Sequence, residues 1–329
     1  MVKKKYKKPL IIAEIGNNHE GSFNLARKYI KAASDCGVDA VKFQAIRPDE
    51  IVLKTYRRRY LQLKKFNLTF QQYRKLSSFA KKLKLKFGVS VFDIDSIKYL
   101  KPYVDFFKIA SGDNNFFDLI KTVLQTKKKV IISLGLLNYK QINKLKKYVS
   151  SVTKLDNVTF LHCVTDYPVN PEEANLKSIP YLRDSLKINI GYSDHTLGIT
   201  APIIATTYGA KIIEKHFTLD NNQSEFRDHK ISVDPVNMKM MVNEIEKTFK
   251  MLGSYKKVVS KREKKNLLYA RRSLYLKRNI QKNEKITKDN LMILRPQAGI
   301  PLEKLKKILG KKSKKSLSSN TVLKINYLK

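Results

Sequence analysis

Four of the five histidines of this 329-residue chain lie at the end of an apolar run or in the turn that follows one. Two of them, His195 and His216, close consecutive runs, so their imidazoles could converge on one site. Two converging imidazoles beside oxygen donors suit a divalent first-row metal such as Mn, Fe or Zn. Because two histidines are too few for a closed structural zinc site, open positions for water or substrate are implied. The alternative for each histidine alone is a buried structural role.

Two lysines lie inside apolar runs, where a charge is costly unless it meets an anion. They are Lys42 and Lys108. Serines stand at the ends of four runs, at Ser90, Ser111, Ser133 and Ser193. A ring of ammonium and hydroxyl donors fits a phosphate together with a carboxylate. The alternative is that each lysine lays its apolar stem along the protein and reaches solvent with its ammonium.

These side chains must be positioned by the apolar runs, which are short, rich in β-branched residues and predicted to be strands. The eight runs span residues 10–16, 40–44, 87–92, 106–111, 130–135, 158–163, 188–193 and 211–218. Stretches with helical periodicity lie between them, at 23–36, 70–85, 116–125, 139–149, 199–208 and 235–252. Eight strand–helix units in roughly 250 residues predict an α/β fold, a (β/α)8 TIM barrel. A doubly wound open sheet is the alternative, but no Gly-x-Gly-x-x-Gly follows any of the runs.

The pattern changes after Gly253, which predicts a barrel over residues 1–253. Residues 254–267 are polar and basic and are predicted to be a linker. Residues 268–329 hold short strands, such as 272–276 and 291–294, separated by turns. We expect them to form a small separate domain, which would be marginally stable alone and would favour docking on another surface.

The net charge of +39 suggests a nucleic-acid partner, but its distribution does not support one. The basic excess avoids residues 151–253, where the net charge is −2, and rises again towards the C-terminus. No basic face with interleaved aromatic residues and no reading motif is evident. We therefore predict a solvated lysine coat that draws anionic substrates inward, and keep a nucleic-acid-binding protein as the non-enzymatic alternative.

The composition also bears on the compartment. No apolar run reaches the roughly 18 residues of a membrane span, so no membrane partner is expected. The basic start, Met1 to Lys5, leads into a strand-like run and does not resemble a signal peptide. With only two cysteines, a disulfide scaffold is excluded and a reducing cytoplasm is predicted.

At these chemistry-bearing positions the sequence resembles the sialic acid (N-acetylneuraminate) synthase family, which includes legionaminate- and pseudaminate-type nonulosonate synthases. The resemblance covers nearly the whole chain, in order. Its segments are Ile11-Ile12-Ala13-Glu14-Ile15-Gly16-Asn17-Asn18-His19, Val41-Lys42-Phe43-Gln44, Phe107-Lys108-Ile109-Ala110-Ser111-Gly112-Asp113, Leu161-His162-Cys163, Gly191-Tyr192-Ser193-Asp194-His195 and Glu214-Lys215-His216-Phe217. The segment from Leu294-Arg295-Pro296 to Gly299-Ile300 resembles the antifreeze-like (SAF) domain of the same family.

The resemblance implies a TIM barrel followed by an antifreeze-like SAF domain that is swapped across a homodimer. It implies a transferase that joins phosphoenolpyruvate to the open-chain aldehyde of an N-acetylated hexosamine. The products would be phosphate and a nine-carbon 2-keto sugar acid. The enol carbon would attack the aldehyde, which a divalent metal would polarise, and the resulting cation at carbon two would capture water.

The family's site residues carry over by position. Phosphoenolpyruvate binding falls to Lys42, Ser90, Lys108, Ser111, Ser133 and Ser193. The metal, usually Mn2+ with Mg2+ or Co2+ as alternatives, falls to His195 and His216. The sugar falls to Glu14, Gln44, Tyr167 and Asp228, and Arg295 would bind the N-acetyl group in the partner subunit's site. Catalytic roles are predicted for Glu14, Lys42, Lys108 and Asp113, with Asp113 orienting or deprotonating the water or handling a sugar hydroxyl.

Several positions near the sugar depart from the family pattern. Asp113 stands where many bacterial relatives have Glu, and residues 225–229 depart from a common Gly-Pro-Asp-His. These changes leave the sugar open between N-acetylmannosamine and a 6-deoxy diacetamido analogue, as in legionaminate or pseudaminate synthases. A further alternative is a 6-phosphorylated sugar, for which the basic surplus could supply an additional anion site.

Overall fold

The computed structural model describes residues 8–329 and divides after Gly253 into two compact units, which are considered separately. The N-terminal residues Met1 to Lys5, on which the prediction of no signal peptide rests, lie outside the described residues. Within residues 8–329 no helix combines the length and the apolar character needed to cross a bilayer.

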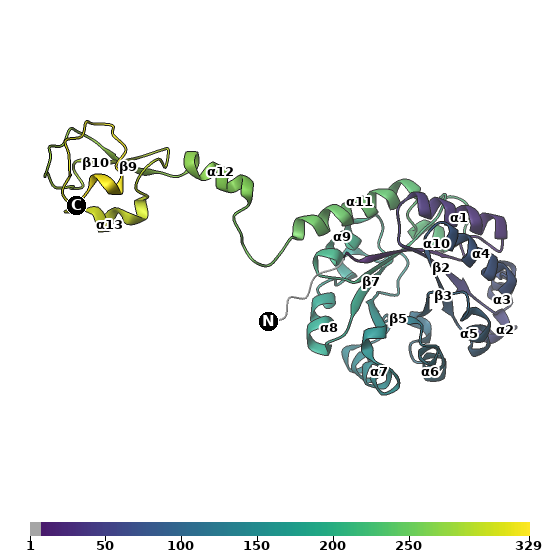
Figure 1. Ribbon diagram of the computed structural model, residues 1–329. Coiled ribbons are helices and arrows are strands. Elements are labelled where there is room, and N and C mark those ends of the chain that lie inside the picture. Colours follow the sequence, from purple (N-terminus) through teal and green to yellow (C-terminus); the bar gives the residue numbers. More distant parts are fainter. Residues whose placement is uncertain (1–7) are drawn as a thin grey trace. The chain divides into compact units, whose positions relative to one another are not determined.

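Eight parallel strands close into a barrel in sequence order, β1 to β8, as Figure 1 shows. They are β1 (Leu10–Gly16), β2 (Ala40–Ala45), β3 (Lys86–Val91), β4 (Phe106–Ile109), β5 (Lys129–Ser133), β6 (Val158–His162), β7 (Ile190–Asp194) and β8 (Ile212–His216). Pairing of β1 with both β2 and β8 closes the sheet. The predicted TIM barrel is confirmed, and the open-sheet alternative is wrong.

Helices surround the barrel (Figure 1). They are α1 (Phe23–Asp35), α2 (Pro48–Ile51), α3 (Arg57–Phe66), α4 (Phe70–Lys82), α5 (Ile94–Leu100), α6 (Phe117–Gln125), α7 (Tyr139–Val152), α8 (Ser178–Leu186), α9 (Thr200–Thr207), α10 (Arg227–Ile231) and α11 (Pro235–Leu252). The six predicted helical stretches correspond to α1, α4, α6, α7, α9 and α11. The other five were not predicted, and three of them, α2, α5 and α10, have seven residues or fewer, too few for helical periodicity to be evident.

The barrel interior is layered because successive strand side chains alternate between its inside and its outside. A floor of apolar side chains comes from six strands: Ile12, Ala40, Phe106, Ile131, Leu161 and Ile212. Gly88 and Gly191 occupy the corresponding places on β3 and β7. A Cβ atom on Gly88 would lie 2.1 Å from the Phe106 ring, so the glycine leaves the room that this ring fills.

The C-terminal unit has its own small core, formed by Leu274, Leu276, Ile280, Ile286, Ile300, Ile308, Leu323 and Leu328. Its strands β9 (Ser273–Leu276) and β10 (Leu291–Leu294) pair antiparallel, close to the predicted strands. Helix α13 (Leu305–Ile308) follows.

The predicted linker, residues 254–267, is not irregular throughout. Helix α12 (Lys261–Ala270) begins inside it. Ser260 accepts a hydrogen bond from the Glu263 amide, and the Glu263 side chain accepts one from the Ser260 amide, which makes a capping box. The capping box was not recognised in the sequence, because the surrounding residues are mostly basic.

We expect Gly88→Ala to destabilise the barrel by overpacking its floor, by about 1–3 kcal/mol. The added methyl group would overlap the buried Phe106 ring. Urea denaturation followed by circular dichroism measures the loss. Gly112→Ala is the control, because its Cβ would meet no heavy atom within 4 Å. Equal unfolding midpoints for the two variants would contradict this description of the floor.

Candidate active site

Eight side chains, one from each barrel strand or the residue directly after it, line a cavity directly above the apolar floor. These eight side chains, here called the polar ring, stand two positions after the floor residues: Glu14, Lys42, Ser90, Lys108, Ser133, Cys163, Ser193 and Glu214. The cavity has a volume of about 440 Å³. It lies at the carboxyl ends of the strands, the end at which TIM-barrel enzymes carry their active sites.

The four charges of the polar ring are buried and paired. The Lys42 ammonium contacts the Glu14 carboxylate and lies 3.9 Å from Glu214 Oε2. The Lys108 ammonium contacts Glu214 Oε1. All four side chains are at most 6 % exposed, so each charge depends on its partner because water cannot compensate it.

The serines of the ring complete its hydrogen bonds. Lys42 Nζ donates to Ser90 Oγ over 2.8 Å, and Ser193 Oγ donates to Glu214 Oε1 over 2.9 Å. Ser133 Oγ is buried and has no partner among residues 8–329. The predicted anion donors therefore share one cavity, and one hydroxyl is available to a ligand.

The two ring carboxylates differ in proton affinity. Burial raises the pKa of Glu14 to about 7, an effect that Lys42 opposes and Glu214 reinforces. Burial would also raise the pKa of Glu214, but Lys108 and Lys42 outweigh it and lower that pKa to about 2. Glu214 is thus ionised at neutral pH and acts as a counter-ion to the lysines, whereas Glu14 exchanges a proton near neutral pH.

His195 and His216 lie together on the cavity wall, with ring centroids 5.5 Å apart. Burial lowers the pKa of His195 to about 4, and burial together with His195 holds the pKa of His216 well below its ordinary value. Both imidazoles are neutral at physiological pH, as metal ligation requires.

Each of the two imidazoles has a ring nitrogen that is available to bind a metal. His195 Nδ1 lies 2.8 Å from the Val164 carbonyl, which fixes that nitrogen as the donor and leaves Nε2 with a lone pair. His216 Nδ1 is buried without a partner among the described residues. No group of three or more His, Cys, Asp or Glu side chains within residues 8–329 is arranged to hold a metal ion. The residues present fit a metal held by two imidazoles, with its other positions open.

Three of the residues predicted to bind the sugar reach the cavity. Glu14, Gln44 and Tyr167 line it, and Gln44 Nε2 donates to Glu14 Oε1 over 3.2 Å. The Tyr167 ring stacks on His195, with centroids 4.2 Å apart.

The remaining predicted site residues differ in whether they line the cavity. Ser111 lines the cavity, but Asp113 and Asp228 are not among its lining residues. Burial raises the pKa of Asp113 to about 6. Asp228 is 7 % exposed and accepts a hydrogen bond from Arg227 Nε over 3.3 Å. Arg295 belongs to the C-terminal unit.

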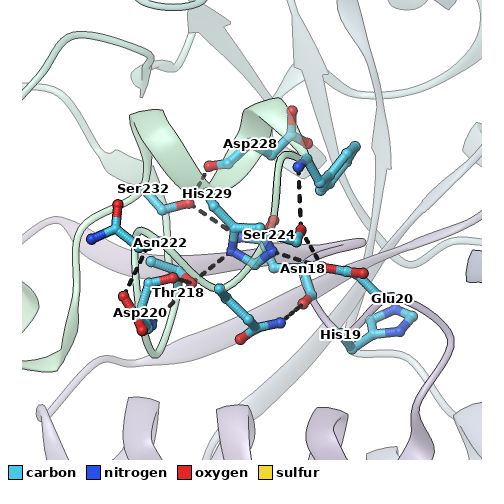
Figure 2. A network of polar contacts seen from close by, with 12 residues as sticks. Asn18, His19, Glu20, Thr218, Asp220, Asn222, Ser224, Asp228, His229 and Ser232 are labelled. Atoms are coloured by element: carbon cyan, nitrogen blue, oxygen red, sulfur yellow. Dashed lines mark hydrogen bonds and ion pairs between the residues drawn. The ribbon is translucent and has the colours of Figure 1, made fainter.

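A largely buried polar network holds the segment after β8 that includes α10 and Asp228 (Figure 2). The imidazole of His229 lies 2.8 Å from Thr218 Oγ1 and 3.2 Å from Glu20 Oε1. Asn18 Nδ2 donates to the Phe217 carbonyl over 2.9 Å. These contacts join the loop after β1 to the loop after β8, so both loops are anchored at the mouth of the barrel.

Comparison with known proteins follows the same division of the chain. Residues 29–257 match the model of the NeuB family, and residues 271–328 match that of the SAF domain. The chain belongs to the NeuB family. The resemblance to sialic acid synthases and the predicted antifreeze-like domain are thereby confirmed.

Characterised relatives of this NeuB-family chain are similar to it over almost their full length. An N,N'-diacetyllegionaminic acid synthase of Campylobacter jejuni is 37 % identical, covering 97 % of this chain and 99 % of that protein. A pseudaminic acid synthase of the same species is 31 % identical, covering 97 % and 96 %. The crystal structure of an N-acetylneuraminic acid synthetase from Leptospira borgpetersenii is 30 % identical, with a TM-score of 0.75 over 81 % of this chain and 94 % of that one.

Sequence reasoning assigned no role to several residues that line the cavity of this NeuB-family barrel. They include Cys163, Asp166, Glu214 and Arg227. Glu214 and Cys163 stand two positions after the buried apolar residues Ile212 and Leu161. Strand alternation alone would therefore have placed both in the polar ring. Arg227, at the start of α10, lies 4.6 Å above the Tyr167 ring, and a contact between such distant segments leaves no periodic signal in the sequence.

We expect Glu14→Gln to change how stability depends on pH. Because the Glu14 pKa is raised from 4.5 to about 7, the folded protein binds a proton that the unfolded chain releases between these values. Wild-type stability therefore falls as the pH rises through this window, and glutamine removes the effect.

We compare the free energies of unfolding of Glu14→Gln and the wild type. The variant's value minus the wild type's should increase by about 1–3 kcal/mol from pH 5 to pH 8. Urea titrations across that range measure it. Glu225→Gln, at a side chain that is 97 % exposed, is the control and should show no such gain. A constant or reversed difference for Glu14→Gln would refute the assignment.

Proposed function

We propose that this chain is a nonulosonate synthase that condenses phosphoenolpyruvate with the open-chain aldehyde of an N-acetylated hexosamine. The products would be a nine-carbon 2-keto sugar acid and phosphate. The observation that carries the proposal is the polar ring, two lysines and three serine hydroxyls at one level, below two neutral imidazoles. Ammonium and hydroxyl donors at one level suit a ligand with phosphate and carboxylate groups.

The ring lysines would bind phosphoenolpyruvate by exchanging their carboxylate partners for the anionic groups of the substrate. Lys42 and Lys108 are paired with carboxylates, so the substrate's anionic groups would take over those contacts. Ser133 Oγ, which has no partner among residues 8–329, would donate to the phosphate. Ser111 lines the same cavity and would add a further donor.

His195 and His216 would hold a divalent metal, Mn2+ in our proposal. When bound, the metal would act as a Lewis acid that polarises the aldehyde. The Tyr167 ring on His195 would keep that imidazole in place and form a wall for the sugar.

The remaining steps require proton transfer. As the enol carbon of phosphoenolpyruvate bonds to the aldehyde carbon, the aldehyde oxygen becomes a hydroxyl and takes up a proton. Water then adds to carbon two and loses a proton, and loss of phosphate leaves the ketone. Glu14 lines the cavity and its pKa of about 7 suits it to exchange either proton. Asp113, with a pKa of about 6, remains the second candidate for the water.

The identity of the sugar stays a choice between N-acetylmannosamine, a 6-deoxy diacetamido analogue and a 6-phosphorylated sugar. We favour the diacetamido analogue, because the legionaminic acid synthase is similar over nearly the whole of both chains. We also propose the cytoplasm as the compartment, where Cys36 and Cys163, both free thiols, would stay reduced. Family membership disfavours the nucleic-acid alternative.

The deciding experiment is a phosphate-release screen with phosphoenolpyruvate, Mn2+ and each of the three sugars. We expect release that requires all three components, with the diacetamido sugar turned over fastest. His195→Ala and His216→Ala should lose activity at least about a hundredfold, since each removes half of the metal's protein ligands. His162→Gln, at a histidine outside the cavity lining, should retain it. Release without metal, or from no sugar, would contradict the proposal.

We further propose that Arg295 acts across a domain-swapped homodimer, which subunit mixing tests. Arg295→Ala and Lys108→Ala should each be nearly inactive alone. Mixed after dissociation, they should recover roughly a quarter of wild-type activity, because half the dimers are hybrids and each hybrid has one intact site. Mixing two preparations of Lys108→Ala is the control. No recovery from a confirmed hybrid would exclude the swap.

A further inference from the structure

An ion pair is enclosed behind the cavity wall, on the strands that carry the two histidines. Asp194 on β7 lies directly opposite Lys215 on β8 in the pairing register. The residues on either side of each, Ser193 and His195 on one strand and Glu214 and His216 on the other, line the cavity. Strand alternation therefore points Asp194 and Lys215 away from the cavity. Both side chains are fully buried, at 0 % exposure.

The contacts of this pair leave none of its principal groups without a partner. Lys215 Nζ donates to Asp194 Oδ2 over 2.7 Å and also to the Thr196 carbonyl. Asp194 Oδ1 accepts from the Tyr192 hydroxyl and the Thr196 amide, both over 2.9 Å, and from the Thr196 hydroxyl over 2.8 Å. Asp194 and Thr196, the residues before and after His195, are thus joined by hydrogen bonds, and Lys215 ties both of them to β8.

Stability alone does not account for such a pair. Removing two charges from water offsets most of their attraction, and apolar replacements of similar volume are often as stable. An apolar pair would lack directional hydrogen bonds to specific partners. Lys215 contacts both Asp194 and Thr196, the neighbours of His195 in sequence, and itself precedes His216. The pair therefore sets the spacing of two strand ends at the point where the imidazoles leave them.

We propose that the Asp194–Lys215 pair is a positioning device that holds His195 and His216 at the separation a shared divalent metal requires. The inference rests on the proposed metal role of these histidines. The two residues touch neither metal nor substrate, and act through the backbone of the strands that carry the ligands. Groups that hydrogen-bond metal ligands directly change metal affinity by about 10- to 100-fold when they are lost, and we expect an effect towards the lower end of that range for a pair that acts through the backbone.

The variants must separate positioning from folding. Asp194→Asn/Lys215→Met removes the charges and the tie between the strands, but asparagine can still accept from Thr196 and Tyr192, and methionine fills the space of the lysine stem. Lys215→Met alone leaves the Asp194 carboxylate buried without its counter-ion. It should lower the Tm of the metal-free protein by roughly 10 °C. The double variant should retain a Tm within a few degrees of the wild type.

The decisive measurement is the Mn2+ affinity of the full-length, metal-depleted protein, from the electron paramagnetic resonance signal of free Mn2+. We expect the Kd of the double variant to rise at least tenfold although its Tm is preserved. Arg47→Met is the control. It removes the contact of Arg47 with Asp93, outside the cavity lining, and should leave Mn2+ affinity unchanged.

Three outcomes would overturn the inference, and they are distinguishable from one another. If the wild type binds Mn2+ and the stable double variant binds it equally well, the pair has no positioning role while the proposed function stands. If the wild type binds no Mn2+, the metal role of the histidines fails and the inference fails with it. If the double variant loses stability in proportion to its affinity, the pair is purely structural.

Discussion

Four charges held at one level of a closed barrel dominate this molecule. Closure brings one inward side chain from every strand to the same height, and the apolar floor below removes water from one side. The Glu14 and Glu214 carboxyl groups contact the Lys42 and Lys108 ammonium groups there and offset part of the cost of burying them. The same arrangement creates a binding site, because an anionic ligand can take the place of the carboxylates without exposing the lysines to an apolar surrounding.

The histidines above the ring follow from the same constraint. Burial keeps both imidazoles neutral, and the lysines below disfavour their protonation further. A neutral pair of nitrogens beside a paired set of charges leaves the cavity near electrical balance. A dianionic or trianionic substrate would upset that balance, and a divalent cation beside it would restore much of it. In the proposed function, anion donors and metal ligands would therefore be two parts of one electrostatic design. At the ends of β7 and β8, the ring residue and the histidine stand two positions apart, so both face the same cavity.

Much of this could be predicted from the sequence, because strand periodicity is a local signal. The barrel, the lysines, the ring serines and both histidines were predictable from apolar runs and the residues that end them. The role of Glu214 was not assigned, although its place two residues after Ile212 marks it. Arg227 could not be found in this way, because it begins the five-residue helix α10, and its position over Tyr167 depends on how the segment after β8 folds back. Helix α12 was missed because a lysine-rich composition concealed its capping box.

Some cavity residues come from the strands and others from the segments that connect them, and this difference bears on substrate selection in the proposed function. The ring and the histidines come from the strands or the residues directly after them, so their geometry is set by the closed sheet and varies little with loop sequence. Tyr167 comes from a loop and Arg227 from the short helix α10, and both line the cavity mouth. The network through Glu20 and His229 anchors the segment after β8 without using the ring. In the proposed function, changes at the mouth would therefore alter sugar preference and leave the chemistry below unchanged, as expected where a rigid scaffold carries variable loops.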